Sequence, residues 1–130
     1  MNTRAQIIPA GSVISVDMGA YRHYAIAASG PYGATAIAPS GKATKVIEEP
    51  LESLMARGRD FRVEPIWGRF DGVTVVARAR QMLGRQYDLL VFNCEHFVRL
   101  VHGLKPKSPQ LIGAGLSLLL LILVILGMSD

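Results

Sequence analysis

The single cysteine of this chain stands at a position that could change its chemistry. The chain has 130 residues, with one Cys and three His. Cys94 lies in the stretch N-C-E-H-F-V-R-L-V-H-G, residues 93–103, directly after Asn93, which is a favourable helix N-cap. A thiol in the first turn of a helix meets unpaired N–H groups and the positive end of the helix dipole, and both favour the reactive thiolate. Free cysteines are also often buried and inert, so residue type alone leaves both interpretations open.

A nucleophilic cysteine needs an imidazole within hydrogen-bond reach, and the three histidines differ in their suitability. His96 is two residues along the same predicted helix, so we expect it to point away from Cys94 and to serve structure. His102 is near the expected end of that helix, where it would interact favourably with the dipole. His23 begins a predicted strand, and a strand packed on the inward face of the helix would bring it to Cys94. The alternative for His23 is an ordinary core or edge histidine.

The first half of the chain reads as short strands separated by turns. Period-two alternation and the turn signals S-G-P-Y-G and P-S-G-K predict three strands, over Gly11–Val16, His23–Ala27 and Thr35–Ala38. Two further segments alternate in places, Thr44–Glu49 and Phe61–Trp67, and they flank a short polar helix or loop over Leu51–Arg59.

Two helices are predicted in the second half. The first has Asp71 as N-cap and Gly84 as its stop, and Val75, Ala79 and Met82 share one face. The second begins at Cys94 and ends at Gly103. Its inward face, at spacings i, i+3, i+4 and i+7, is formed by Cys94, Phe97, Val98 and Val101.

The C-terminal segment Leu111–Met128 contains no charged residue. Its roughly 18 residues would form a helix of about 27 Å, close to the hydrocarbon thickness of a bilayer. A buried core helix is the alternative, but a domain of about 110 residues would not readily surround a helix that is apolar on every side. We therefore expect a transmembrane tail anchor over 111–128, preceded by a basic linker over 105–110 and a folded domain over 1–104.

Charge flanking the apolar segment predicts its orientation. Lys105 and Lys107 precede it, which favours a cytosolic location for the folded domain. The N-terminal residues lack an apolar core of signal-peptide length, and a lone cysteine suits a reducing compartment. The chain has a net charge of +4, and Asp130 is the one acidic residue beyond the anchor, so the remainder is more basic still. We expect attraction to anionic headgroups, and no nucleic-acid binding, because aromatic and basic residues are not interleaved.

Two short stretches resemble signatures of the lecithin retinol acyltransferase family. Y-R-H-Y-A-I, residues 21–26, and N-C-E-H-F-V, residues 93–98, match tightly, and the resemblance is close to the small phospholipase A and acyltransferase branch. G-S-V-I-S-V and R-A-R-Q-M-L-G are similar to the strand before the family's histidine and the helix before its cysteine. The C-terminal anchor is a further shared feature. The resemblance implies an α+β fold of the circularly permuted, papain-like (NlpC-type) kind, with an antiparallel sheet packed on helices.

The resemblance also implies a mechanism without cofactor or metal. Cys94 would be the nucleophile and His23 its base. The enzyme would take an acyl chain from a glycerophospholipid of the bilayer as a thioester and pass it to water or an amine. The oxyanion would be stabilised by backbone N–H at the helix start, with Tyr21 as a weaker candidate.

One position departs from the family pattern. A second polar residue, often histidine, usually orients the base and precedes an alanine–proline pair, here Ala38-Pro39. This chain reads Y-G-A-T-A-I-A-P there, and Thr35 is the nearest polar candidate. A misoriented imidazole lowers the rate by orders of magnitude. Three functions therefore remain open: a lipid acyltransferase or phospholipase A, an inactive membrane adaptor with the same fold, and a cysteine peptidase or amidase.

Overall fold

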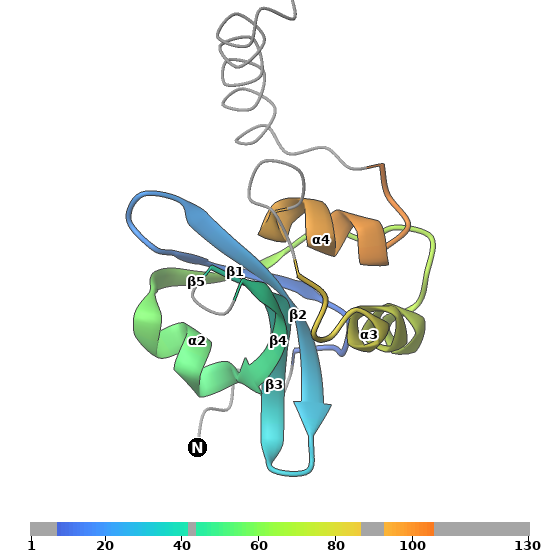
Figure 1. Cartoon of the computed structure of the whole chain (residues 1–130), viewed down its shortest axis with the longest axis horizontal. Coiled ribbons are helices and arrows are strands. Elements are labelled where there is room, and N and C mark those ends of the chain that lie inside the picture. Colours follow the sequence, from blue (N-terminus) through green and yellow to red (C-terminus); the bar gives the residue numbers. More distant parts are fainter. Residues whose placement is uncertain (1–7, 42–43, 87–92, 106–130) are drawn as a thin grey trace, which may run out of the picture.

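A five-stranded antiparallel sheet forms the centre of the molecule (Figure 1). The computed structural model describes residues 8–41, 44–86 and 93–105. The strands are β1 (Val13–Asp17), β2 (Arg22–Gly30), β3 (Gly33–Ser40), β4 (Lys45–Pro50) and β5 (Arg59–Glu64), in the spatial order β4-β3-β2-β1-β5. Each adjacent pair is antiparallel. With three helices in the described chain, this arrangement confirms the predicted mixed α+β class.

The helices lie on both faces of the sheet (Figure 1). Helix α2 (Leu51–Arg57) covers one face, whereas α3 (Gly72–Gln81) and α4 (Cys94–Val101) cover the other. Side chains alternate between the two faces along a strand. In β2, Ala25 and Ala27 accordingly belong to the α2-side core, and Ile26 and Ala28 to the core beneath α3 and α4.

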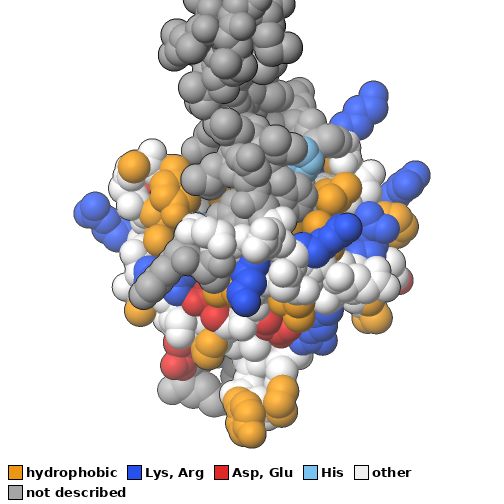
Figure 2. All heavy atoms as spheres, viewed as in Figure 1, with side chains coloured by type: hydrophobic (Ala, Val, Ile, Leu, Met, Phe, Trp, Pro, Cys, Tyr) orange, Lys and Arg blue, Asp and Glu red, His pale blue; other side chains and the backbone are white. Residues whose placement is uncertain are grey.

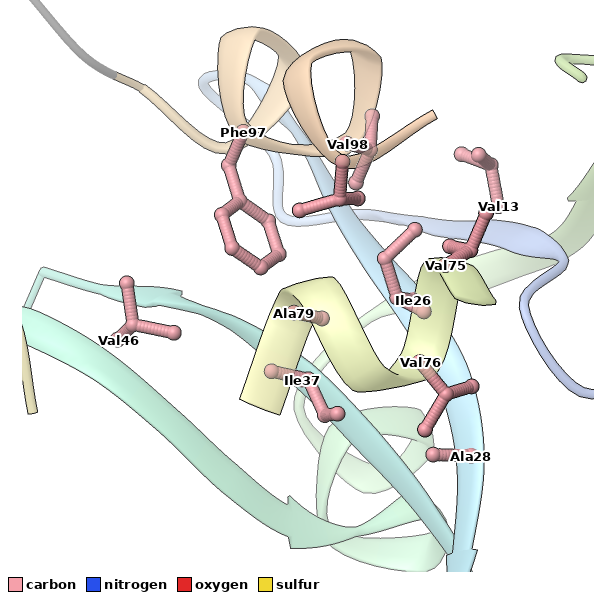
Figure 3. Packing of buried hydrophobic residues seen from close by; sticks show 11 residues of the cluster. Val13, Ile26, Ala28, Ile37, Val46, Val75, Val76, Ala79, Phe97 and Val98 are labelled. Atoms are coloured by element: carbon pink, nitrogen blue, oxygen red, sulfur yellow. The ribbon is translucent and has the colours of Figure 1, made fainter. Parts of the chain in front are cut away.

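Helix α4 is held in place by its buried apolar face (Figure 3). Phe97, Val98 and Val101 are buried in the cluster that also contains Ile26 and Ile37. A helix of eight residues is unstable alone in water, so this packing is what maintains it. The predicted inward face is confirmed for these three residues, and the packing fixes the start of α4 over β2.

The predicted starts of both helices and the predicted end of α4 are also confirmed, whereas α3 ends at Gln81, before the predicted stop at Gly84. The Asp71 carboxylate accepts the Thr74 N–H at 2.8 Å and caps α3. The Asn93 side chain accepts the His96 N–H at 2.8 Å and caps α4. Gly103, after α4, has a φ of 77°, a left-handed conformation that favours glycine.

The predicted strands are all present with different bounds, and two of the differences are informative. The third strand was expected to end before Pro39, but β3 continues through Pro39 to Ser40, paired with β4. The strand expected over Phe61–Trp67 is β5, which begins at Arg59 and ends at Glu64. Pro65 follows, and its lack of an N–H group ends the ladder.

No helix among the described residues is long and apolar enough to cross a bilayer. The predicted anchor 111–128 lies outside the described residues, as does most of the predicted linker. The described ranges also contain no cluster of three or more His, Cys, Asp or Glu side chains placed to hold a metal ion.

Candidate active site

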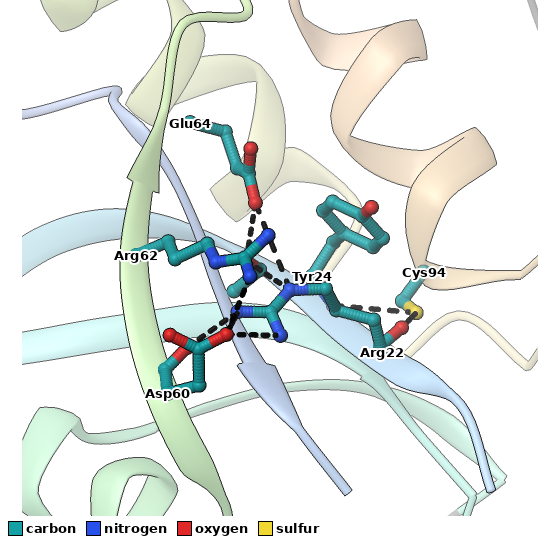
Figure 4. Close-up of polar contacts among 7 residues, drawn as sticks. Arg22, Tyr24, Asp60, Arg62, Glu64 and Cys94 are labelled. Atoms are coloured by element: carbon teal, nitrogen blue, oxygen red, sulfur yellow. Dashed lines mark hydrogen bonds and ion pairs between the residues drawn. The ribbon is translucent and has the colours of Figure 1, made fainter.

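The sulfur of Cys94 lies against the backbone of β2 on both sides of His23 (Figure 4). Sγ accepts the N–H of Tyr24 at 3.4 Å, and the thiol faces the carbonyl oxygen of Arg22 at 3.9 Å. The structure therefore brings the start of α4 to the part of β2 that carries His23.

The edge of β2 that faces β3 is open at this point, because the β2–β3 ladder ends before it. The backbone N–H and C=O of Ala27 form hydrogen bonds with Ser12 and Gly11, on the β1 side of β2. Because the backbone groups of successive residues in a strand point alternately to its two sides, Tyr24 directs its N–H and C=O toward β3. The β2–β3 ladder ends at the pair Ile26 and Ile37, and the same register continued would oppose Tyr24 to Pro39. Proline has no N–H to donate to the Tyr24 carbonyl oxygen in such a pair. Because the ladder stops before this pair, the Tyr24 N–H has no partner on β3, and the sulfur of Cys94 accepts it.

The imidazole of His23 extends from the opposite face of β2. Strand alternation places it with Ala25 on the α2 side, and the residue is only 7% exposed. Its ring lies edge-on to the ring of Tyr21, with centroids 6.3 Å apart, and its charged neighbours are Arg57 and Glu49. Any contact between the imidazole and the sulfur would therefore have to be made around the open edge of β2 rather than through the sheet.

Both reactive groups are held in their neutral forms. The pKa of His23 is lowered to about 4, mainly by burial and to a smaller extent by Arg57, and Glu49 partly opposes these effects. Burial raises the pKa of Cys94, while the N–H groups of Tyr24, Glu95 and Cys94 itself partly oppose that rise. At neutral pH these shifts leave the imidazole unprotonated and the thiol protonated.

A charged network holds the Arg22 end of the site (Figure 4). Arg22 Nε donates to Ser15 Oγ at 2.9 Å, and Ser15 Oγ donates to Glu64 at 2.5 Å. The guanidinium also contacts Asp60, which pairs with Arg62 at 2.6 Å. These contacts join β1, β2 and β5, and they hold the peptide whose carbonyl faces the thiol.

Thr35 is not brought to His23, contrary to the predicted orienting role. Its hydroxyl donates to Glu48 at 2.7 Å, and it pairs with Ala28 across the ladder. Ala28 is five residues from His23 along β2, which corresponds to about 16 Å. Thr35 instead lines a cavity of about 600 Å³ at the other end of the hairpin, with Glu48 and Arg80.

Tyr21 is placed beside His23, with 47% of its surface exposed. Its proposed support of an oxyanion stays a prediction. The groups that sequence reasoning missed are backbone donors, above all the Tyr24 N–H. No local signal in the sequence marks it, because the place where the β2–β3 ladder ends is known only once the register is known.

His102 has a structural role that its sequence position did not reveal. It is completely buried, with Nε2 2.7 Å from the Gly11 carbonyl oxygen and Nδ1 accepting the Gly68 N–H at 3.3 Å. The ring also lies edge-on to Trp67 at 4.9 Å. His102 thus joins the segment before β1, the loop before α3, and the end of α4, rather than acting as a partner of the helix dipole.

A mixed α+β domain with a cysteine at a helix start, set against a strand that carries a buried histidine, contains the residue types that thiol enzymes use. The sequence model of the lecithin retinol acyltransferase family matches residues 6–104. The chain therefore belongs to this family, whose chemistry is that of acyltransferases and hydrolases. No curated protein matches the chain.

Proposed function

We propose that this protein is a membrane-anchored thiol acyltransferase of the phospholipase A type, with a papain-like domain in permuted order. The observation that supports it most directly is the contact of the Cys94 sulfur with the β2 backbone at both neighbours of His23. Family membership supports acyl transfer, and the apolar segment 111–128 supports a membrane location with the domain facing the cytosol.

The proposed reaction has two steps. Cys94 Sγ attacks an ester carbonyl of a glycerophospholipid while His23 accepts the thiol proton. The C–O bond then breaks, the lysophospholipid leaves with that proton, and Cys94 carries the acyl chain as a thioester. Water or an amine attacks the thioester in the second step and restores the thiol. The N–H groups at the start of α4 supply the positive end of a helix dipole for the oxyanion.

The neutral state of both groups determines how His23 would act. An imidazole with a pKa of about 4 cannot hold the thiol proton in the resting enzyme. It acts as a general base as the carbon–sulfur bond forms, a contribution that is typically about 10²–10⁴-fold in rate. The anchor raises the effective concentration of lipid at the site.

The test uses the full chain in phosphatidylcholine and phosphatidylethanolamine vesicles, with lysophospholipid and N-acylated lipid as the measured products. We expect product and an acyl adduct on Cys94, detected by mass spectrometry. Cys94→Ser should lose the thioester, and His23→Asn should lower the rate by at least about 100-fold. Thermal unfolding of each variant controls for misfolding. Undiminished product from a folded Cys94→Ala variant would exclude this chemistry.

A non-catalytic membrane adaptor is the second candidate, and one observation favours it. Thr35, the residue expected to orient the imidazole, donates to Glu48 instead, and the sheet face beside His23 carries small apolar side chains, those of Ala25, Ala27, Ala36 and Ala38. This candidate predicts that the wild-type protein binds vesicles but yields neither thioester nor lysolipid.

A further inference from the structure

Basic side chains gather around the C-terminal end of α4. Arg78 donates to the carbonyl oxygens of Val101 and Leu100 at 2.9 and 3.0 Å. Arg99 Nε donates to the carbonyl oxygen of Lys105 at 3.0 Å. The last carbonyls of a helix lack partners within it and lie at its negative end, so cations stabilise them. The local cause of the cluster is therefore helix termination.

Aromatic and apolar side chains lie beside these cations. Trp67 packs edge-on against His102 but remains 46% exposed, and Val73 is 78% exposed. The guanidinium groups of Arg69 and Arg78 lie 5.3 and 4.3 Å from the centre of the Phe70 ring. We call the surface formed by Trp67, Arg69, Arg78, Arg99 and Lys105 the C-terminal patch. Figure 2 shows basic side chains projecting from the flank of the molecule formed by α3 and α4.

The C-terminal patch has an excess of positive charge. Over residues 66–81 and 96–105 the sequence contains one acidic residue, Asp71, and its carboxylate already accepts the N–H of Thr74. Cations mixed with a half-exposed tryptophan are the composition of surfaces that lie at the boundary of a bilayer.

The chain leaves the described domain at this patch. Six Cα–Cα steps separate Lys105 from Leu111, where the apolar segment begins, and these span at most about 22 Å. With 111–128 in the bilayer, the C-terminal patch is the part of the domain that the tether keeps closest to the headgroups.

We propose that the C-terminal patch docks on the anionic surface of the bilayer, with Arg69, Arg99 and Lys105 at the phosphates and Trp67 in the interfacial layer. This inference rests on the proposed anchor and goes beyond it, because an anchor alone leaves the domain free to rotate. Docking would also set the height of the active site, since Cys94 begins the helix whose other end carries the patch. Eight residues of α-helix correspond to about 12 Å.

Trp67 provides a direct probe, because it is the only tryptophan of the chain. The full chain is reconstituted into phosphatidylcholine vesicles with and without phosphatidylserine, and flotation verifies that it stays with the vesicles. With phosphatidylserine present, we expect Trp67 emission to shift to shorter wavelength and acrylamide quenching to fall several-fold. Each cation at an anionic surface favours the docked state by about fivefold. High salt should reverse both changes.

Charge reversal identifies the surface responsible. The double substitution R69E/R99E should restore acrylamide quenching in phosphatidylserine vesicles to its value in neutral ones. The control R59E/R85E makes the same change in net charge and should leave docking intact. Arg59 begins β5, and Arg85 directly precedes Gln86, which pairs with Lys45 of β4; both arginines are exposed. Matched unfolding midpoints show that the variants are folded.

The outcomes separate docking from anchoring. Flotation with equal quenching in both kinds of vesicle, or equal effects of the two double substitutions, would overturn docking and leave the anchor standing. Failure to float would overturn the anchor and, with it, the docking that depends on it. Neither outcome alters the measurement of thioester formation at Cys94.

Discussion

The protonation state of the Cys94–His23 pair can be tested by the pH dependence of alkylation. Cys94 is the only cysteine, so the rate of its reaction with iodoacetamide reports on one thiol. Burial raises its pKa above the ordinary 9.0, and burial lowers the pKa of His23 to about 4. These two directions predict a resting pair of neutral thiol and neutral imidazole, not a thiolate–imidazolium pair.

The expected magnitude follows from those values. With a pKa above 9.0, the thiolate fraction at pH 7 is below about 1%. An ion pair would require the imidazole to be the stronger base, whereas its pKa lies at least about five units below that of the thiol. The alkylation rate should therefore rise about tenfold per pH unit from pH 6 to 9, since only the thiolate reacts.

The variant His23→Asn should leave this slope unchanged, because the imidazole does not create the resting thiolate. It should nevertheless abolish most acyl transfer, for which proton acceptance in the transition state is needed. N-acetylcysteine, alkylated in parallel, provides the reference for the reagent. A rate plateau in the wild type with a midpoint below pH 7, absent from His23→Asn, would show an ion pair and refute the argument from burial.

Three further results are expected. His23 has a pKa of about 4 in the folded protein and 6.5 in the unfolded chain. The stability that it contributes is therefore present above pH 6.5 and falls by about 3 kcal/mol as the pH decreases to 4. Denaturant titrations should show a smaller decline for His23→Asn, and equal declines in the two proteins would contradict the assigned pKa. His102→Ala should lower the free energy of unfolding by about 3 kcal/mol, because it leaves a buried carbonyl and a buried N–H without partners; a loss below about 1 kcal/mol would show that both are satisfied otherwise. Thr35→Val should keep lysophospholipid production within about twofold while lowering stability by about 1 kcal/mol through its lost hydrogen bond; a large loss of product at unchanged stability would restore Thr35 as an orienting residue.

Local patterns were sufficient for most elements of this fold. The caps Asp71 and Asn93 and the spacing of Phe97, Val98 and Val101 each act within one or two helical turns, and all were confirmed. Apart from the end of α3, which lies before the predicted Gly84, the failures involve contacts between strands. Pro39 was expected to end its strand, yet β3 continues through it in its pairing with β4. A proline is compatible with a strand when its nitrogen, which carries no hydrogen, faces the side on which no strand is paired.

Thr35 shows the same limit for the candidate site. Its distance in sequence from the alanine–proline pair made it the nearest polar residue to the expected orienting position. The register of β2 with β3 decided otherwise, because it opposes Thr35 to Ala28 and turns its hydroxyl to Glu48. A shift of the hairpin register by a few residues would have changed this outcome without changing the local pattern.

The sequence by itself determined the order of elements, the place of a lone thiol at a helix start, the family resemblance, and the expectation of an apolar anchor. These depend on short-range periodicity, capping and composition. Only the tertiary structure decided that the sulfur accepts the Tyr24 N–H, that His23 extends from the face of β2 covered by α2, and that His102 is a buried link. Those facts depend on the register of the sheet and on which residues are removed from water. Burial holds the thiol and the imidazole in their neutral forms, and no single segment of the sequence encodes it.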